Sequence, residues 1–272
     1  MWVFTKNRNM IEVEPLAGLA NRMRVIDSAY WLARDLGKDL LVTWTPYKGL
    51  NCSFFALFDK PEDFSVRERR PDIFHENRLF SLYFFFRSLG FGKAINMRGV
   101  TKNKLDHEKI PELEKKKKIL IASVHQFYQP ERPFYRFVPR DTIRERIDAV
   151  MKGYSAHTVG VHIRRADSKL SIQTSTTDKF VCIMNETLKK EPGTTFFLST
   201  DSPEEELLLS GEFGEKVLFT KKELSRNSEQ GIMDALVDLY CLGGTRKIIG
   251  SYYSSFSEVA ARLQGIPLEI VT

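Results

Sequence analysis

Two adjacent arginines end the most distinctive motif of the chain. Arg164 and Arg165 directly follow residues 159–163, an apolar run that predicts a buried strand. A guanidinium stays charged and presents a fixed fork of donors, so a pair at a strand end suits a phosphate or pyrophosphate. An ion pair with Asp167 or another acid would explain the same residues equally well. His162, between apolar neighbours, is typical of a hydrogen-bonded core histidine.

A second apolar run, residues 196–199, ends in Thr200, Asp201 and Ser202. The Pro203 and three glutamates that follow indicate a helix start, for which Ser202 is a natural N-cap. Helix capping therefore accounts for the serine. It does not account for Asp201, which can face a cleft at this strand end.

A third predicted strand, residues 247–250, is followed by a hydroxyl-rich loop. The loop leads to Ser254, Ser255 and Phe256 at the start of a predicted helix. Backbone N–H groups and the positive helix end make such a place receptive to phosphate. An ordinary N-cap serine is the competing interpretation.

A weaker signal lies near the N-terminus. Gly18, Ala20 and Asn21 form a turn whose small residues would let a ligand approach the backbone closely.

Strands and helices that could position these residues follow from the hydrophobic spacing. Residues 10–14 predict a strand, 15–21 a loop, 22–36 a helix with Arg22 among its polar positions, and 40–44 a second strand. This βαβ unit implies a parallel sheet. Residues 46–118 show no clean periodicity, so we expect irregular structure with one helix near 77–89. A strand at 119–124 and a helix at 141–152 follow, the helix with a Thr142–Glu145 capping box.

The alternation of strands and helices becomes regular after His157. We expect strands at 158–163, 195–199, 216–219, 247–250 and 267–271, and helices at 177–190, 203–209, 228–242 and 256–264. This pattern predicts a second doubly wound sheet. The sequence therefore indicates an α/β protein with two Rossmann-like domains, residues 1–154 and 155–272, facing a cleft.

Composition excludes several classes. The 272 residues are 42% hydrophobic and carry a formal net charge of +6, which fits a globular protein and favours an anionic ligand. Three dispersed cysteines fit a reducing compartment, and no HxxxH, Asp-x-Asp, P-loop, GxSxG, HExxH or GxGxxG motif occurs. Without a signal peptide at the N-terminus, the protein is predicted to be cytoplasmic and bacterial in style. A nucleic-acid binder is disfavoured because no recognisable basic module is present.

Together these segments resemble the superfamily of GDP-fucose-dependent fucosyltransferases, which includes α1,6-fucosyltransferases, the nodulation fucosyltransferase and protein O-fucosyltransferases. Residues 161–167 look like its first motif, 198–202 its second, and 237–243 with 249–256 its third. Gly18 to Arg22 resembles the loop-and-helix opening of the group.

The resemblance implies a GT-B-like architecture and an inverting, metal-independent transfer of fucose from GDP-fucose to a glycan or polysaccharide, with an α1,6 or α1,2 linkage. The resemblance implies that Arg164 binds the β-phosphate, with Arg165 in support. It implies that His162 and Asp238 hold the nucleoside and that Asp201 lies at the rim of the nucleoside pocket. The pyrophosphate and fucose would be contacted by Ser254, Ser255 and Phe256, and Asn21 would lie near the sugar.

Two departures from the family pattern bear on these roles. Ala20 stands where the group often has glycine, and residues 168–177 lack a glutamate that could act as base, leaving Asp167 and Asp178 as candidates. A non-catalytic GDP or GDP-sugar binding protein is therefore the alternative.

The aromatic and basic stretch 67–93 is expected on the acceptor side. Phe84, Phe85 and Phe86, with Arg78 and Arg87, would suit peripheral contact with the inner membrane. We favour core packing for these aromatic residues over that membrane contact.

Overall fold

The structure, a computed structural model, describes residues 9–70, 79–97, 105, 110–129, 132–166 and 168–272. The chain folds into two compact units. Unit 1 comprises Met1–Val138 with Arg226–Ile232, and unit 2 comprises Pro139–Ser225 with Met233–Thr272. The sequence led us to expect a domain boundary near residue 154, just after helix α6 (Asp141–Met151). In the structure this helix belongs to unit 2, which begins at Pro139.

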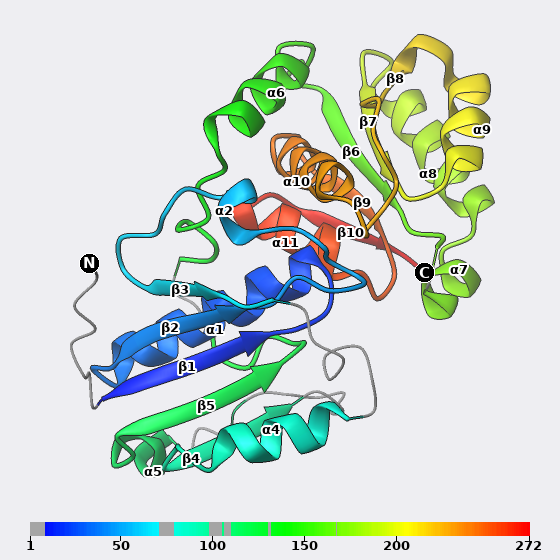
Figure 1. The fold of residues 1–272 in the computed structure, drawn as a ribbon. Helices are drawn as coiled ribbons and strands as arrows, with labels where there is room; N and C mark the ends of the chain where they lie inside the picture. Colours follow the sequence, from blue (N-terminus) through cyan, green and yellow to red (C-terminus); the bar gives the residue numbers. More distant parts are fainter. Residues whose placement is uncertain (1–8, 71–78, 98–104, 106–109, 130–131, 167) are drawn as a thin grey trace. The chain divides into compact units, whose positions relative to one another are not determined.

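Unit 1 is built on a five-stranded parallel sheet of order β3-β2-β1-β5-β4 (Figure 1). Its strands are β1 (Met10–Pro15), β2 (Asp39–Trp44), β3 (Ser65–Glu68), β4 (Lys93–Met97) and β5 (Lys118–Ser123), and its helices are α1 (Leu19–Asp35), α2 (Phe54–Leu57), α4 (Phe80–Ser88) and α5 (Ile110–Glu114). The predicted βαβ opening and the strand near residue 119 are confirmed.

The expectation of irregular structure around one helix in residues 46–118 is wrong in part. The helix is present as α4, but β3 and β4 extend the sheet at both edges. An edge strand is partly solvated and needs no apolar run. Most residues of both strands are exposed or half-buried, so their sequences carry no strand periodicity.

The two faces of β1 carry different side chains. Ile11 and Val13 are fully buried on one face, whereas Glu12 and Glu14 are buried on the other. Helix α4 covers the glutamate face: the hydroxyl of Tyr83 donates to Glu14 Oε1 at 2.6 Å, and Phe80 and Phe84 pack with residues of β5. A charged layer thus lies beneath α4.

Unit 2 contains the second five-stranded parallel sheet, of order β10-β9-β6-β7-β8. Its strands are β6 (Thr158–Ile163), β7 (Thr195–Thr200), β8 (Val217–Leu218), β9 (Ile248–Ser251) and β10 (Leu268–Val271). The helices after α6 are α7 (Lys169–Thr174), α8 (Thr177–Lys190), α9 (Pro203–Phe213), α10 (Glu229–Gly243) and α11 (Ser255–Gln264). The predicted doubly wound sheet is confirmed, with α7 as an additional short helix.

Helices cover both faces of this sheet. Phe180 and Met184 of α8 and Leu209 of α9 join the core on one face. On the other face the backbone approaches closely: a Cβ on Gly160 would stand 3.0 Å from Leu242 of α10, and one on Gly250 would stand 2.8 Å from Ser257 of α11. These glycines allow α10 and α11 to pack directly on the strands.

The capping box predicted for α6 is wrong. The helix begins at Asp141, its N-cap residue is Arg140, and no side chain caps it. Thr142 therefore lies within the first turn, too late in the chain to act as the cap.

Candidate functional site

The carboxyl ends of β6, β7 and β9 gather the predicted residues of unit 2. From β6 the chain proceeds outward through β7 and β8, and then returns to place β9 on the other side of β6. Successive connections therefore leave β6 and β9 in opposite directions. In open α/β sheets, ligands bind at the carboxyl ends of the strands beside such a switch point.

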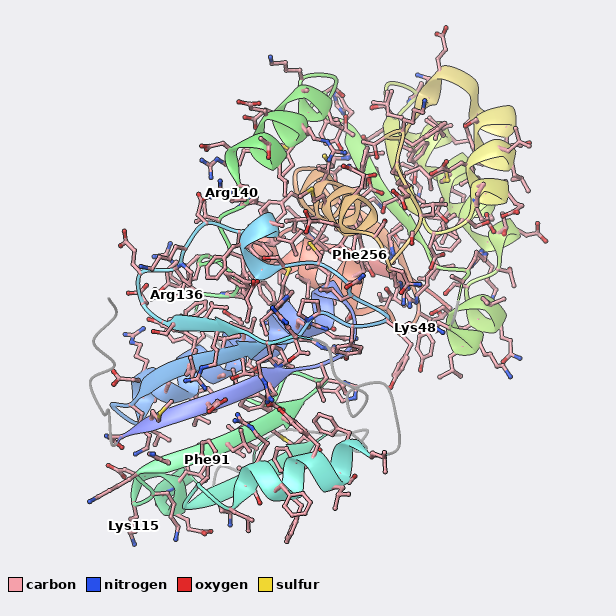
Figure 2. All side chains as sticks on the ribbon, in the orientation of Figure 1. Lys48, Phe91, Lys115, Arg136, Arg140 and Phe256 are labelled. Atoms are coloured by element: carbon pink, nitrogen blue, oxygen red, sulfur yellow. The ribbon has the colours of Figure 1, made fainter. Side chains whose placement is uncertain are left out.

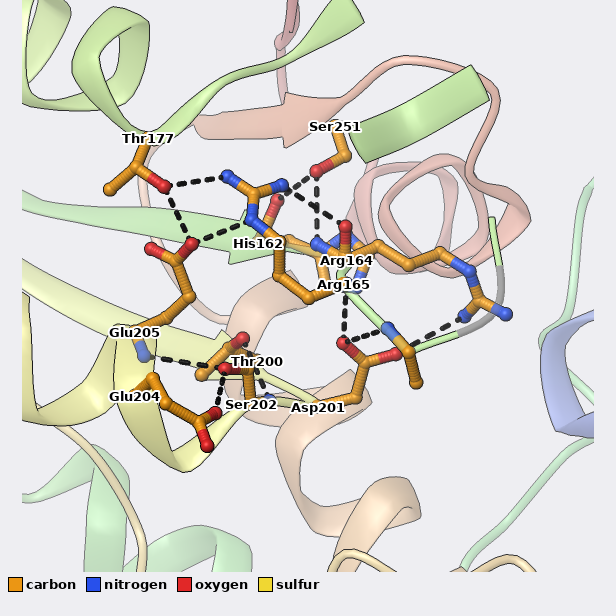
Figure 3. A network of polar contacts seen from close by, with 11 residues as sticks. His162, Arg164, Arg165, Thr177, Thr200, Asp201, Ser202, Glu204, Glu205 and Ser251 are labelled. Carbon is orange, nitrogen blue, oxygen red and sulfur yellow. Dashed lines mark hydrogen bonds and ion pairs between the residues drawn. The ribbon is translucent and has the colours of Figure 1, made fainter. Parts of the chain in front are cut away.

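Backbone hydrogen bonds fix the loop that follows β6 (Figure 3). The Arg164 N–H donates to Ser251 Oγ at 3.0 Å, and that hydroxyl donates to the His162 carbonyl at 3.3 Å. Asp201 Oδ1 accepts from the N–H groups of Arg165 and Ala166, at 2.6 and 3.2 Å. Side chains from β9 and from the end of β7 thus hold the double-arginine segment in one conformation.

The two arginines point in opposite directions in Figure 3. Arg165 Nε donates to Glu205 Oε1 at 2.6 Å, and its Nη2 donates to Thr177 Oγ1 at 3.1 Å. Its side chain is 14% exposed, and that of Glu205 is 9% exposed. Arg165 therefore forms an internal ion pair that connects the loop to α8 and α9.

Arg164 extends the other way. Its side chain is 22% exposed, and its ion pair with Asp201 has an N–O separation of 4.0 Å, longer than a hydrogen bond. A charged fork on a fixed backbone, in a partly exposed position, can accommodate a bidentate anion.

Helix α11 begins beside this segment of β9. Ser254 is its N-cap residue, as the capping interpretation predicted, but its hydroxyl makes no capping bond. Ser254 Oγ is buried and has no hydrogen-bond partner in the described part of the chain. Tyr253, in the left-handed region at φ +55°, turns the chain into the helix. The first N–H groups of a helix lack intrahelical partners, so Ser255 and Phe256 belong to a donor-rich turn.

His162 lies beneath this turn. Its ring stacks on that of Phe256 with a centroid separation of 5.0 Å and an interplanar angle of 25°. Burial, with Arg164 and Lys222 nearby, lowers the pKa of His162 to about 3. Its Nδ1 has no partner within the described residues. The imidazole is therefore neutral at physiological pH, and its Nδ1 lacks the bond that the expectation of a hydrogen-bonded core histidine would give it.

Asp238 of α10 is held in a buried polar cluster. Its carboxylate accepts from Thr220 Oγ1 at 2.7 Å and from Lys222 Nζ at 2.8 Å. Lys222 also lies 3.0 Å from Glu206. Burial acts to lower the pKa of Lys222, but Asp238 and Glu206 outweigh it and raise that pKa. Sequence reasoning identified Asp238 and missed Lys222, which lies in a charged loop without periodicity.

In unit 1 the predicted turn residues begin α1, at the carboxyl end of β1. Gly18 is the N-cap residue, while Ala20 and Asn21 lie in the first helical turn. Asn21 Oδ1 is buried without a hydrogen-bond partner in the described part of the chain. The structure therefore places these residues together, on a different unit from Arg164.

Arg22 was expected at a polar position of this helix, but it is fully buried. Its guanidinium lies 4.5 Å from the Trp44 ring centroid and 4.8 Å from that of Tyr47. Nε donates to the Ala17 carbonyl and Nη1 to the Thr45 carbonyl, both at 2.9 Å. Burial lowers the pKa of Arg22 to about 10, and it stays charged at neutral pH. This residue secures the turn before α1.

The sequence offered Asp167 and Asp178 as candidate bases. Asp167 lies outside the described residues, and Asp178 is exposed in the first turn of α8. Among the described residues, no group of three or more His, Cys, Asp or Glu side chains could hold a metal ion. No described helix has the length and apolarity needed to cross a bilayer.

No protein-family model matches the sequence, and no curated protein matches it. The structure is similar to solved fucosyltransferases. The Bradyrhizobium enzyme NodZ, an α1,6-fucosyltransferase soaked with GDP-fucose, is 20% identical with a TM-score of 0.62, covering 94% of this chain and 92% of its own. A mutant of Arabidopsis thaliana FUT1 in complex with GDP is 15% identical with a TM-score of 0.65, covering 96% of this chain and 70% of its own. POFUT1 in complex with GDP-fucose is 11% identical with a TM-score of 0.58, and the alignment covers 98% of this chain and 99% of the POFUT1 chain. These similarities establish the fold as GT-B-like, with two doubly wound parallel-sheet units.

Proposed function

We propose that this protein is a glycosyltransferase that moves fucose from GDP-fucose to a glycan acceptor. The observation that carries the proposal is the placement of Arg164 at the switch point of unit 2, on a backbone held by Ser251 and Asp201. The solved structures of the same fold, with GDP or GDP-fucose in their crystals, support GDP-fucose as the donor.

The chemistry required at such a site is the stabilisation of a leaving group. In an inverting transfer, the oxygen of an acceptor hydroxyl attacks the anomeric carbon from the face opposite GDP, and its proton passes to a base or to water. The bond from that carbon to the β-phosphate oxygen breaks, and its electron pair remains on GDP. Arg164 donates two parallel hydrogen bonds to the β-phosphate as this charge grows. The backbone contacts hold the residue that carries this guanidinium in place before the reaction begins, which reduces the reorganisation required.

The start of α11 provides the second part of the donor site. The Ser254 hydroxyl and the N–H groups of Ser255 and Phe256 bind the pyrophosphate and fucose, aided by the positive end of the helix. His162 and Asp238 contribute to nucleoside binding. The neutral His162 ring presents one nitrogen as an acceptor and the other as a donor, which suits a base or ribose.

Arg165 has a positioning role in this scheme. Its guanidinium is bonded to Glu205 and Thr177, and it supports the loop that carries Arg164. Asp201 acts in the same way through backbone N–H groups. We assign donor binding to unit 2 and acceptor binding to unit 1.

The transfer is proposed to proceed without a metal ion. Arg164 and the α11 terminus together supply the positive charge that a divalent cation would otherwise provide. The alternative, a protein that binds GDP-sugars without catalysis, keeps the same donor contacts and lacks only a base.

Donor hydrolysis distinguishes these two functions. A transferase is expected to release GDP slowly from GDP-fucose with water as acceptor, above a protein-free blank, whereas a binding protein releases none. Calorimetry supplies the binding test: GDP should bind more tightly than UDP. Equal affinity for UDP, or no affinity for either nucleotide, would contradict the proposed donor.

A further inference from the structure

Helix α4 is apolar on both of its faces. Phe80, Tyr83 and Phe84 are buried against the sheet of unit 1. The opposite side carries large hydrophobic side chains that are 44–70% exposed, which we call the α4 outer face: Leu79, Leu82, Phe85, Phe86 and Leu89. A surface helix of a globular protein normally places polar residues on that side. The expectation of core packing thus holds for Phe84 and is wrong for Phe85 and Phe86.

The one charged side chain of this helix is directed inward. Arg87 bonds to Glu12, and its Nη2 lies 3.7 Å from Glu14. Burial acts to lower the pKa of Arg87, but these two carboxylates outweigh it and raise that pKa. Residues 79–92 contain no other charged residue. The α4 outer face therefore presents a surface without charge to its surroundings.

A run of four lysines lies at the C-terminal end of this helix. The Gly92 N–H donates to the Lys118 carbonyl at 2.9 Å, and a Cβ on Gly92 would stand 3.8 Å from the Lys116 side chain. Lys115, Lys117 and Lys118 are exposed, and none of the four forms an ion pair with a described residue. Figure 2 shows the labelled Phe91 and Lys115 at this same end of unit 1. The lysine run thus lies beside the C-terminal end of the helix that carries the apolar face.

We propose that the α4 outer face and Lys115–Lys118 form a docking surface for a membrane rich in anionic lipid. Exposed phenylalanine and leucine side chains enter the boundary between headgroups and acyl chains. The neighbouring lysines bind the lipid phosphates, and their flexible stems let the ammonium groups reach them. The proposal rests on the surface of unit 1 alone and is independent of the proposed transfer reaction.

The lysines favour lipid over a second copy of the chain as the occupant. A symmetric dimer formed through the α4 outer face would bring both lysine runs to one interface, where like charges repel. An anionic membrane neutralises the lysines while it covers the apolar side chains.

Vesicle sedimentation tests the proposal. The purified protein is mixed with phosphatidylcholine vesicles that either contain or lack phosphatidylglycerol, and the pelleted fraction gives a partition coefficient. We expect binding to the anionic vesicles and much weaker binding to the neutral ones. Phe85→Ser and Phe86→Ser should each weaken partitioning about tenfold, because each substitution removes apolar surface that would enter the membrane. Each of Lys115→Gln and Lys117→Gln should weaken it about fivefold.

Matched controls lie in unit 2. Leu207 and Leu208 of α9 are also exposed, as are Lys189 and Lys190 at the C-terminal end of α8. Leu207→Ser with Leu208→Ser, and Lys189→Gln with Lys190→Gln, should leave partitioning unchanged. Circular dichroism should show that every variant is folded, and GDP-fucose hydrolysis should be equal in the α4 variants and the parent, which separates this proposal from the donor site.

Three outcomes would overturn the membrane proposal. The first is an absence of binding to anionic vesicles, and the second is binding that survives the α4 substitutions. The third is a protein that does not bind vesicles but forms a dimer, detected by light scattering, that Phe85→Ser dissociates. This result would assign the surface to a second copy of the chain.

Discussion

Replacement of Arg165 by methionine should destabilise unit 2 by about 3 kcal/mol. The substitution removes the donors 2.6 Å from Glu205 and 3.1 Å from Thr177 and leaves the Glu205 carboxylate buried. Loss of one partner from a buried ion pair costs about 3–5 kcal/mol. We take the lower end because Thr177 Oγ1 still donates to Glu205 at 2.6 Å.

The second arm of the experiment removes both charges. The double variant Arg165→Met with Glu205→Leu leaves no unpaired charge, and its stability should return to within about 1 kcal/mol of the parent. A matched control is Lys247→Met, because Lys247 pairs with Glu269 at 3.0 Å where both side chains are partly exposed. That substitution should cost at most about 1 kcal/mol.

Urea unfolding followed by circular dichroism measures all three variants. If Arg165→Met costs no more than Lys247→Met, Arg165 is a surface residue and its positioning role is wrong. If the double variant is no more stable than Arg165→Met, the cost does not arise from the unpaired glutamate.

Three further predictions concern the other site residues. Arg22→Met should cost about 3 kcal/mol in urea unfolding, because the Ala17 and Thr45 carbonyls lose their donor in a buried place, and a cost below about 1 kcal/mol would contradict this. The pKa of His162 is about 3 in the folded protein, against 6.5 ordinarily, so the unfolded chain binds the proton first as pH falls. Stability should therefore drop by about 2 kcal/mol from pH 7 to pH 5, and His162→Gln should reduce this dependence; an equal slope in both proteins would refute the assignment. Addition of EDTA should leave GDP-fucose hydrolysis unchanged, and activity that disappears with chelator and returns with manganese would contradict the arginine-based mechanism.

The regular half of the chain was predictable because its elements carry strong local signals. The strand at 158–163 and the helix at 177–190 have the predicted bounds. Their apolar residues recur at the strand and helix periods, and the Ser202–Pro203 pair marks the start of α9, where Ser202 Oγ accepts from the Glu205 N–H. Edge strands such as β3 lack this signal because solvent replaces half of their packing.

The polar contacts that shape the site were not predictable in this way. Arg164 meets Ser251 across 87 residues of sequence, and Arg165 meets Asp201 across 36. Sequence spacing can place each residue at a strand end, but it cannot say which of two adjacent arginines turns inward. That choice depends on Glu205 and Thr177, whose positions the packing of α8 and α9 decides.

The burial of Arg22 has a similar explanation. Arginine between apolar positions predicts a solvated face, whereas Trp44 and Tyr47 enclose the guanidinium from a different strand and loop. Two aromatic rings and two carbonyls replace water for this charge. The Gly18–Asn21 turn was recognised from its small residues, but the side chain that secures it was not.

The most direct test of the proposed mechanism is the paired measurement of turnover and thermal midpoint for Arg164→Lys. An ammonium cannot make two parallel hydrogen bonds to the β-phosphate, so GDP release from GDP-fucose should fall by about 10²–10³ in kcat. The side chain is partly exposed and its ion pair with Asp201 is long, so the stability of the variant should change by about 0–1 kcal/mol. Near-normal turnover, or a loss of activity explained by unfolding, would contradict the role of Arg164 in leaving-group stabilisation.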